Sequence, residues 1–443
     1  MSMIDSIEKP TTAAPPLPPS VDVTDMQFGR LGLISIVERA VKRNGPIVTL
    51  NLPGGQKMTV LGAAAHGAFW QANPDAFHKD LKNPNSGVAM TRRVLGDTLL
   101  TAKDGPEWQQ MRREMTSLLS VSKPWFQRPL SGATNQLVSD LVTRPDVPLL
   151  EHCMAWATRA ICDPLIGERA LDASAQGIVH ALNNCFLALL SDPSAAHVAA
   201  TQKQYADVMD RIAQHRGPDS VAHHILTAAP KGADHIALLQ NVVGGLLVAS
   251  LHINALSLFW ALTQIAEDDD LQKRLSFEGR VWEDTPRRAV DTPLAYACVR
   301  ESQRIKPVMA FIERQVAQTI DIDNHQLTAG DTVLFSPWLV QRNSAMWTDP
   351  LTFNPDNFAK GVRHPVGSYL PFGLGARQCP GTNLVNQQLT FAISGVFQKL
   401  QLAPNPETRP GDIAPMFRVN LEPRGQVRLN ATPICSTQEK VKL

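Results

Sequence analysis

The sequence has 443 residues, of which 44% are hydrophobic and 19% are charged, and its formal net charge is +1. A chain this apolar can bury a large core, which excludes a mostly disordered protein. A charge balance near neutral lacks the basic surplus that nucleic acids and anionic membranes attract, so neither partner is expected. At about 150 residues per domain, the length alone favours three domains.

The first 20 residues, MSMIDSIEKPTTAAPPLPPS, contain no apolar core. The sequence therefore predicts neither a secretory signal nor a membrane anchor at this end. The Pro, Thr and Ala content is typical of a flexible leader, to which we assign residues 1–25.

The cysteines are widely spaced and form no Cys-x-x-Cys pair, which argues against a disulfide framework and against a zinc ribbon. This usage favours a reducing compartment, and the predicted location is the cytoplasm. The six positions are Cys153, Cys162, Cys185, Cys298, Cys379 and Cys435.

The N-terminal part predicts a helix over 31–43 and two short strands, 47–52 and 57–61. The turn Pro53-Gly54-Gly55 between those strands favours a hairpin. From about 105 to 305 the pattern is mostly helical, and after 311 it returns to short strands and turns before a last helix over 383–399. Small β parts at both ends of a helical middle favour one mixed domain, residues 26–443, over three.

One expected helix, 236–266, contains no Asp, Glu, Lys or Arg and carries apolar residues on every side. Such a helix crosses either a protein core or a bilayer. Polar residues interrupt it too often for a comfortable membrane span, which favours a central buried helix. Polar groups need partners when buried, so the stretch 250–254 indicates either satisfied helix packing or the wall of a cavity.

The loop 372–381, FGLGARQCPG, lies just before the last helix. It lacks the third glycine of GxGxxG and the Gly-Lys-Ser/Thr of a Walker loop, which excludes a phosphate loop. Its one cysteine, Cys379, lies where backbone N–H groups and a helix N-terminus stabilise a thiolate. A lone thiolate cannot build a zinc site, but it can be the axial ligand of a haem iron, with Arg377 paired to a propionate. A buried cysteine in a turn is the alternative.

This loop matches F-x-x-G-x-R-x-C-x-G, the haem-binding signature of the cytochrome P-450 superfamily, at every defined position. The chain resembles that family over roughly residues 28–428. The resemblance implies a mainly α fold with a minor β portion (α+β) in a single domain around a buried haem b (iron protoporphyrin IX). It makes Cys379 the metal ligand, places Phe372 and Gly373 in the haem-binding loop, and gives Arg314 the role of a propionate arginine.

Two further pairs look like motifs of this family. Glu301 and Arg304 resemble the E-x-x-R pair, because positions i and i+3 share a helix face and the side chains can pair. Trp108 and Arg112 resemble W-x-x-x-R, whose indole N–H and guanidinium both reach a propionate.

The segment 353–358 resembles the family's P-E-R-F, with one departure. Asn357 stands in place of the arginine that completes a triad with the E-x-x-R pair. Because asparagine carries no charge, we expect a weaker brace at this point.

The clearest departure lies in the buried helix, which corresponds to the long helix across the oxygen-binding face of the haem in this family. The usual motif there, A/G-G-x-D/E-T-T/S, supplies an acid and an alcohol that relay protons during oxygen activation. This sequence reads ASLHIN over 249–254, so that His252 replaces the acid and Ile253 replaces the threonine.

Several kinds of function fit this departure. In a monooxygenase, a substrate hydroxyl or an ordered water held by Ser250 or Asn254 replaces the alcohol. Oxidative coupling, desaturation, isomerisation or dehydration needs no such relay. Peroxide-driven oxidation is a third reaction, although this helix lacks the arginine that usually pairs with a substrate carboxylate there. A non-catalytic haem-binding sensor or carrier also stays open, and His252 is either a satisfied core histidine or a direct iron ligand.

The resemblance also implies partners. The expected pocket lies against Leu247–Ile253, Val308–Phe311, the stretch 80–100, and Met416 and Phe417. Its apolar composition favours a hydrophobic small-molecule substrate, with a place in specialised metabolism.

Neither a Gly-rich dinucleotide fingerprint nor a ferredoxin-type cysteine cluster occurs in the sequence. Electrons are therefore expected from a separate ferredoxin and ferredoxin reductase, docked on basic residues near the Cys loop and 108–113, Arg113 among them. A monomer is expected.

Overall fold

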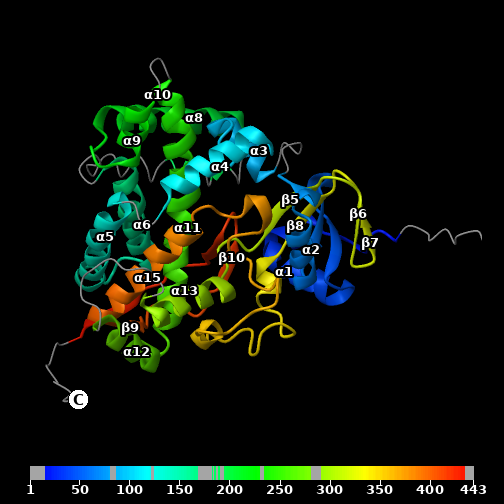
Figure 1. Ribbon diagram of the computed structural model, residues 1–443. Coiled ribbons are helices and arrows are strands. Elements are labelled where there is room, and N and C mark those ends of the chain that lie inside the picture. Colours follow the sequence, from blue (N-terminus) through cyan, green and yellow to red (C-terminus); the bar gives the residue numbers. More distant parts are fainter. Residues whose placement is uncertain are drawn as a thin grey trace, which may run out of the picture.

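A computed structural model describes residues 15–79, 86–120, 124–167, 194–229, 234–280 and 291–434, together with residues 182, 184, 185, 188 and 189. The chain is mostly helical with a minor sheet portion, as the sequence predicts (Figure 1). Residues 1–14 of the expected leader, residues 80–85 of the expected pocket wall, and Cys435 lie outside the described residues.

The largest sheet has the strand order β1-β2-β3-β8-β5-β4. Its strands are β1 (Ser20–Asp22), β2 (Ile47–Asn51), β3 (Lys57–Leu61), β4 (Phe77–His78), β5 (Ile312–Val316) and β8 (Thr332–Phe335). The predicted hairpin is confirmed, because β2 and β3 pair antiparallel across the turn Pro53–Gly55. β3 then pairs in parallel with β8, with Thr59 opposite Val333, so strands from residues 20–78 and from 312–335 build one sheet.

Three smaller two-stranded sheets complete the β portion. They pair β6 (Ile320–Ile322) with β7 (His325–Leu327), β9 (Leu400–Pro404) with β12 (Leu429–Pro433), and β10 (Pro415–Phe417) with β11 (Leu421–Pro423). All three are antiparallel, and the β10–β11 hairpin lies next to the candidate site described below.

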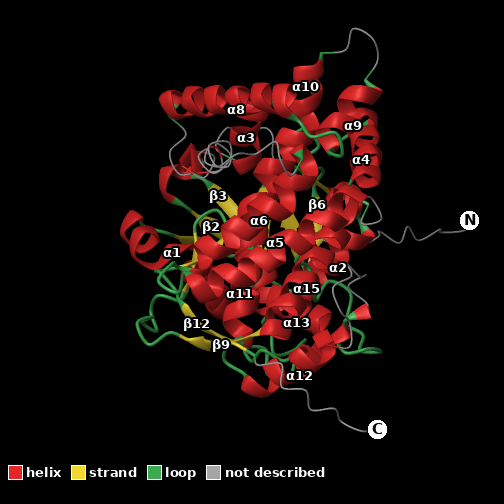
Figure 2. Cartoon of the chain, turned by 90° about the vertical axis from the view of Figure 1, so that its left-hand side faces the viewer, coloured by secondary structure: helices red, strands yellow, loops and turns green. Residues whose placement is uncertain are grey.

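The helices gather mainly on one side of the large sheet, on the left of Figure 1. They are α1 (Asp25–Asn44), α2 (Ala64–Ala72), α3 (Gly87–Leu95), α4 (Pro106–Leu118), α5 (Pro124–Thr143), α6 (Leu149–Ile166), α8 (Ala195–His215), α9 (Val221–Ala228), α10 (His235–Leu239), α11 (Gly245–Ile265), α12 (Asp269–Arg280), α13 (Pro293–Ile305), α14 (Pro337–Val340) and α15 (Thr382–Lys399). α6 packs against both α5 and α11, and α15 contacts α5, α11, α12 and α13, as the stacked helices of Figure 2 show.

The predicted buried helix is confirmed as a continuous stretch of α10, a π-helical turn Gln240–Gly244, and α11. The stretch Ala237–Ile265 is long and apolar enough to cross a membrane, but 61% of its most apolar window is buried inside the protein. Burial of this kind is what a helix through a protein core shows. The polar residues of this helix therefore face either other helices or an internal cavity.

The π-helical turn is fixed from outside by α8. Tyr205 of α8 donates its hydroxyl to the Gln240 carbonyl at 2.7 Å. A Cβ at Gly244 would overlap the phenol ring of Tyr205, so the close approach of the two helices requires glycine there. Single π turns inside α-helices are frequent at functional sites, and Asn241 of this one lines the cavity described below.

Candidate functional site

A cavity of about 690 Å³ lies between α11, the Cys loop and the tip of the β10–β11 hairpin. Most of the surface that lines it is apolar. It brings together the predicted site residues from all parts of the chain: Trp108, Arg112, Ser250, His252, Ile253, Asn254, Arg314, Phe372, Gly373, Arg377 and Cys379.

Only some of the residues predicted to line this cavity do so. Val308, Met309, Phe311 and Phe417 line it, as do several residues of 87–100. Leu247 and Leu251 instead pack into the adjacent apolar core, because they lie on the opposite face of α11. Ala310 and Met416 are likewise absent from the lining.

The Cys loop takes its shape from backbone bonds and glycines. The Cys379 N–H donates to the Phe372 carbonyl at 2.9 Å, which closes the loop. Gly373 and Gly375 have φ angles of +71° and +66°, a region that favours glycine. A side chain at Gly375 would also lie 3.3 Å from Nε1 of Trp70. The glycines of the sequence motif are therefore required by the path of the chain that presents the sulfur.

The electrostatics of Cys379 correct one expectation. Burial raises the pKa of its thiol, and this outweighs the backbone N–H of Gly381, the charge of Arg112 and the hydroxyl of Thr382, which lower it. The loop alone therefore does not hold a thiolate. A thiolate at this position needs a further positive partner, and a metal ion in the cavity would supply one.

Six cationic side chains line the same cavity: Lys79, Arg112, Lys306, Arg314, Arg377 and Arg418. Burial lowers the pKa of the first five. Burial, and after it the charge of Arg377, lowers the pKa of Arg314 to about 10. The Nε of Arg314 is buried without a hydrogen-bond partner, and its Nη1 donates only to the Glu313 carbonyl. The charge and the unused donors fit an anionic ligand.

Lys79 is a site residue that the sequence did not reveal. Its Nζ donates to the Leu100 carbonyl at 2.7 Å. Burial, together with the charges of Arg314 and Arg377, lowers the pKa of Lys79 to about 7. Lys79 matches no sequence motif. It reaches the site because β4 pairs with β5, which brings the end of β4 next to Arg314.

Trp108 and Arg377 were both expected to bind a haem propionate, but their side chains make other contacts. The indole N–H of Trp108 was expected to reach a propionate, but it donates to the Leu99 carbonyl at 3.0 Å. The ring instead supports the guanidinium of Arg377, which lies 3.9 Å from its centroid. Arg377 itself bonds Asp104 at 2.6 Å and the carbonyls of Leu99 and Ala102. Trp108 and Arg377 therefore tie the segment before α4 to the Cys loop.

These features together fit the expected haem. The cavity is apolar, as a porphyrin requires, and one cysteine thiol, that of the half-buried Cys379, faces it. Arg112 makes no side-chain hydrogen bond within the described part of the chain, and Arg314 keeps its Nε unused. These unsatisfied cations match the two carboxylates of a haem.

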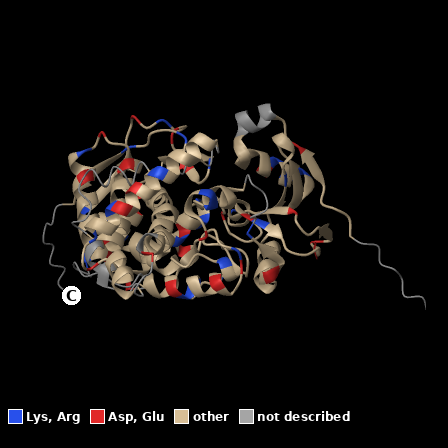
Figure 3. Cartoon of the chain, turned by 90° about the horizontal axis from the view of Figure 1, so that it is seen from above, with Lys and Arg blue, Asp and Glu red and all other residues tan. Residues whose placement is uncertain are grey.

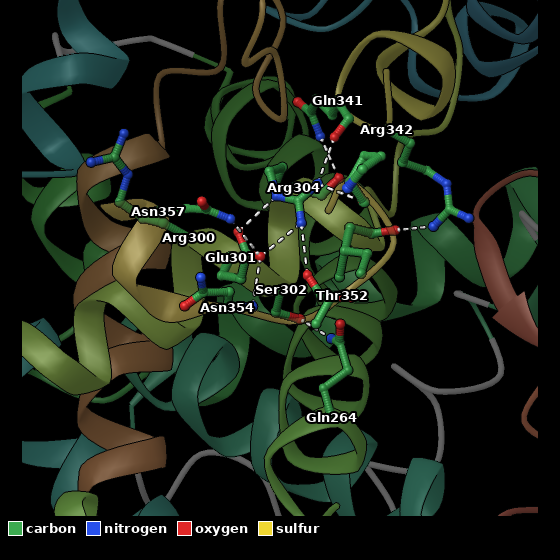
Figure 4. A network of polar contacts seen from close by, with 12 residues as sticks. Gln264, Arg300, Glu301, Ser302, Arg304, Gln341, Arg342, Thr352, Asn354 and Asn357 are labelled. Carbon is green, nitrogen blue, oxygen red and sulfur yellow. Dashed lines mark hydrogen bonds and ion pairs between the residues drawn. The ribbon is translucent and has the colours of Figure 1, made fainter. Parts of the chain in front are cut away.

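The pair Glu301 and Arg304 lies outside the cavity and holds the segment below it (Figure 4). Arg304 donates to both carboxylate oxygens of Glu301 and to the carbonyls of Gln341, Pro350 and Thr352. Asn357 reaches the carboxylate as well, through a hydrogen bond of 3.1 Å to Oε1 of Glu301. The departure from the family motif thus keeps the contact and loses the charge.

The polar residues of α11 are largely engaged. The hydroxyl of Ser250 donates to the Leu246 carbonyl, and the amide of Asn254 lies 3.5 Å from Gln388 of α15. Nε2 of His252 lies 3.3 Å from the Glu422 carboxylate of β11. His252 is therefore paired with a carboxylate of the chain, which argues against its service as an iron ligand.

The expected docking face for a ferredoxin carries Arg113, which is exposed on α4 and bonds Gln110 at 2.6 Å. Seen from above, Lys and Arg are intermixed with Asp and Glu over the chain (Figure 3).

Comparison with solved structures shows the fold. Retinoic acid-bound cyanobacterial CYP120A1 superposes with a TM-score of 0.81 at 15% identity, over 95% of this chain and 100% of that one. The heme domain of cytochrome P450DA gives a TM-score of 0.80 at 16% identity, over 95% and 99%.

Curated relatives are more similar in sequence. The mitochondrial 25-hydroxyvitamin D-1 alpha hydroxylase of Rattus norvegicus is 25% identical over 384 residues, which cover 75% of this chain and 75% of that protein. The steroid 17-alpha-hydroxylase/17,20 lyase of Oryzias latipes is 29% identical over 221 residues, which cover 47% and 43%. The chain spans less than half the length of several such relatives. A family model described as Cytochrome P450 matches residues 197–428, more than half of the chain.

Proposed function

The chain belongs to the cytochrome P450 family, whose cofactor is haem b, and on this premise we propose that it is a haem-thiolate monooxygenase acting on a hydrophobic small molecule. The proposal rests on the cavity of about 690 Å³, because it presents the Cys379 sulfur and the unsatisfied cations to the same space. Residues 26–443 would form one haem domain.

Each site residue then has a stated task. Cys379 would coordinate the iron, Arg112, Arg314 and Lys79 would bind the carboxylates, and Arg377 would hold the segment before α4 against the Cys loop. Haem in this setting activates molecular oxygen with electrons supplied by a partner protein. The chain's own part is to exclude bulk water, hold the substrate against apolar walls such as Val308 and Phe311, and deliver protons.

The apolar lining supports a hydrophobic substrate, and two of the relatives are named as hydroxylases of a steroid and of 25-hydroxyvitamin D. We further propose a role in specialised metabolism, a cytoplasmic location, a monomeric state, and a separate ferredoxin with its reductase as electron donors. Arg113 would take part in docking the ferredoxin, and reversing its charge should slow reduction.

A second function is favoured by one observation. Ile253 places an alkyl group where the family has an alcohol, and the Ser250 hydroxyl is directed to the Leu246 carbonyl. Chemistry that needs no proton relay, such as oxidative coupling, desaturation, isomerisation or dehydration, fits this wall, and so does peroxide-driven oxidation. Analysis of products with oxygen and electron donors, against hydrogen peroxide alone, separates these reactions.

The proposal is tested by the reduced carbon-monoxide difference spectrum of the purified haem protein. We expect the Soret band typical of thiolate-ligated haem, and its loss in Cys379→Ala. Cys153→Ala is the matched control, because Cys153 is buried in the helical core, away from the cavity lining, and should keep the band. An imidazole-like band in the wild type would contradict the assignment of Cys379.

A further inference from the structure

The β10–β11 hairpin is attached to α11 at two points. The indole N–H of Trp260 donates to the Leu421 carbonyl at 2.9 Å. Two turns earlier on α11, Nε2 of His252 lies 3.3 Å from Oε1 of Glu422. The first contact joins a side chain to backbone, whereas the second joins two side chains that can both exchange protons. Substitutions at the two contacts can therefore distinguish the attachment of the hairpin to α11 from proton transfer.

The His252–Glu422 pair lies between the cavity and the solvent. The side chain of His252 is 12% exposed and lines the cavity, and that of Glu422 is 13% exposed. On the other side of Glu422, Arg418 lies 3.6 Å from Oε2 and its side chain is 63% exposed. His252, Glu422 and Arg418 therefore follow one another from the cavity wall to the protein surface.

The two imidazole nitrogens are in different situations. Nε2 is engaged by Glu422, and among the described residues no hydrogen bond engages Nδ1. A carboxylate that accepts from one ring nitrogen fixes the tautomer and the orientation of the ring. Nδ1 is then the nitrogen that can exchange protons with water or with a group in the cavity.

We propose that His252 and Glu422 form a carboxylate–imidazole pair that carries protons into the cavity, with the acid supplied by the hairpin and not by α11. The inference rests on the proposed monooxygenase function and deepens it. His252 is the proton carrier, and Glu422 is a positioning residue that acts through it. The sequence alone does not decide whether the polar stretch 250–254 packs against other helices or lines a cavity. The proposal gives this stretch a role in proton transfer.

The step moves one proton at a time. Nδ1 takes a proton from a water that enters the cavity and then gives it to an acceptor there, while the Nε2–H bond to Glu422 stays intact. An O–H bond of the water and then the new N–H bond break, an O–H bond forms on the acceptor, and the hydroxide that remains is neutralised by a proton from bulk water. Electrons come from the separate ferredoxin and its reductase. When proton delivery is poor, oxygen is released as hydrogen peroxide after two electrons and two protons; complete reduction to water takes four of each.

The experiment compares His252→Asn and Glu422→Gln with Trp260→Phe in the haem-loaded protein. Glu422→Gln keeps the size and a polar contact but removes the carboxylate, and Trp260→Phe removes only the other attachment of the hairpin. Oxygen consumption is driven by NADPH through a surrogate ferredoxin and reductase without added substrate, and peroxide and water are quantified. Hydrogen–deuterium exchange of the 415–423 amides reports the attachment of the hairpin independently of activity.

We expect His252→Asn and Glu422→Gln to lower the ratio of water to peroxide by about tenfold or more, with hairpin exchange unchanged. Glu422→Asp should restore part of the ratio. Trp260→Phe should speed hairpin exchange and leave the ratio unchanged. A wild-type ratio in both His252→Asn and Glu422→Gln, or a ratio that follows the exchange rate through all variants, would overturn the proton path.

The two proposals fail in different ways. A wild-type protein without a thiolate-type carbon-monoxide band and without oxygen consumption would overturn the proposed function and the proton path with it. A wild type that shows both, but whose peroxide yield is insensitive to Glu422 and His252, would overturn the proton path alone.

Discussion

Arg304 donates two hydrogen bonds of 2.7 Å to Glu301, and neither side chain exposes any surface. The same guanidinium also bonds the carbonyls of Gln341, Pro350 and Thr352. One buried cation therefore holds α13, the end of α14 and the segment before the Cys loop in a fixed relation.

Replacing Arg304 by Lys should strongly destabilise the protein. A lysine cannot reproduce the planar set of donors, so Glu301 and several carbonyls would lose partners in the interior. We expect a loss of about 3–5 kcal/mol in the free energy of unfolding, measured by urea denaturation of the haem-loaded protein.

Asn357→Ala is the matched comparison. Oε1 of Glu301 keeps the backbone N–H of Asn354 at 2.9 Å and the Arg304 bonds, so only one hydrogen bond, from a neutral amide donor, is lost. The expected cost is about 1–2 kcal/mol. Equal costs for the two variants would show that the brace does not depend on the ion pair.

Gly244→Ala should destabilise the π-helical turn, because the new methyl group overlaps the ring of Tyr205. The ring must move and its hydroxyl then leaves the Gln240 carbonyl. We expect a loss of about 1–3 kcal/mol in the free energy of unfolding.

The adjacent Gly245→Ala provides the control. A Cβ there meets Thr98 only at 3.9 Å, an ordinary contact. Because alanine favours helix over glycine, this variant should be neutral or more stable by about 0.5–1 kcal/mol. If both variants behave alike, the contact with α8 does not determine the glycine.

Gly375→Ala should weaken the Cys loop. Its positive φ costs a non-glycine residue about 1–2 kcal/mol, and the methyl group would press on Trp70 at 3.3 Å. We expect lower stability and faster transfer of haem to apomyoglobin. Gly411→Ala has open space and should change stability by less than about 0.5 kcal/mol. Haem transfer at the wild-type rate in Gly375→Ala would contradict the role given to the loop shape.

Lys79 should make the stability of the haem-free protein depend on pH. Burial lowers the pKa of Lys79 from 10.5 to about 7. Below pH 7 the amine is charged in both the folded and the unfolded chain, and the penalty for the buried charge is complete. Between about 7 and 10.5 the unfolded chain binds the extra proton, so stability rises with pH.

This rise in stability is measured by urea denaturation of the haem-free protein between about pH 6.5 and 9.5, a range that includes the lowered pKa of Lys79 and the values above it. Lys79→Met should flatten the rise in stability with pH. The control Lys203→Met, at an exposed position on α8, should leave that rise unchanged. Haem binding should also flatten the rise, because its carboxylates favour the charged amine. Identical pH profiles for wild type and Lys79→Met would refute the buried charge.

Local patterns predicted much of the fold. The hairpin 47–61, the buried helix and the helix after Cys379 follow from turn chemistry and apolar periodicity, which act over a few residues. The Cys loop could be predicted because its glycines and cysteine are adjacent in sequence. The roles that were corrected depend on how the site packs: the Leu99 carbonyl takes the indole N–H of Trp108, and burial raises the pKa of the Cys379 thiol.

Two site features could not be predicted from local sequence. Lys79 approaches Arg314 because His78 of β4 pairs with Gln315 of β5, a register that no nearby residue encodes. Glu422 meets His252 across 170 positions of sequence. Tertiary packing sets both contacts, and the sequence signal was limited to an unexpected histidine inside an apolar helix.

The pairing of Thr59 with Val333 has a consequence for biosynthesis. The hairpin of β2 and β3 emerges from the ribosome early, with one edge open until β8 has been translated. At about 5–20 residues per second, this interval lasts on the order of ten seconds or more. An unpaired strand edge is a site of aggregation during that time, so slower elongation or scarce chaperone should reduce the soluble yield before any effect on the finished fold.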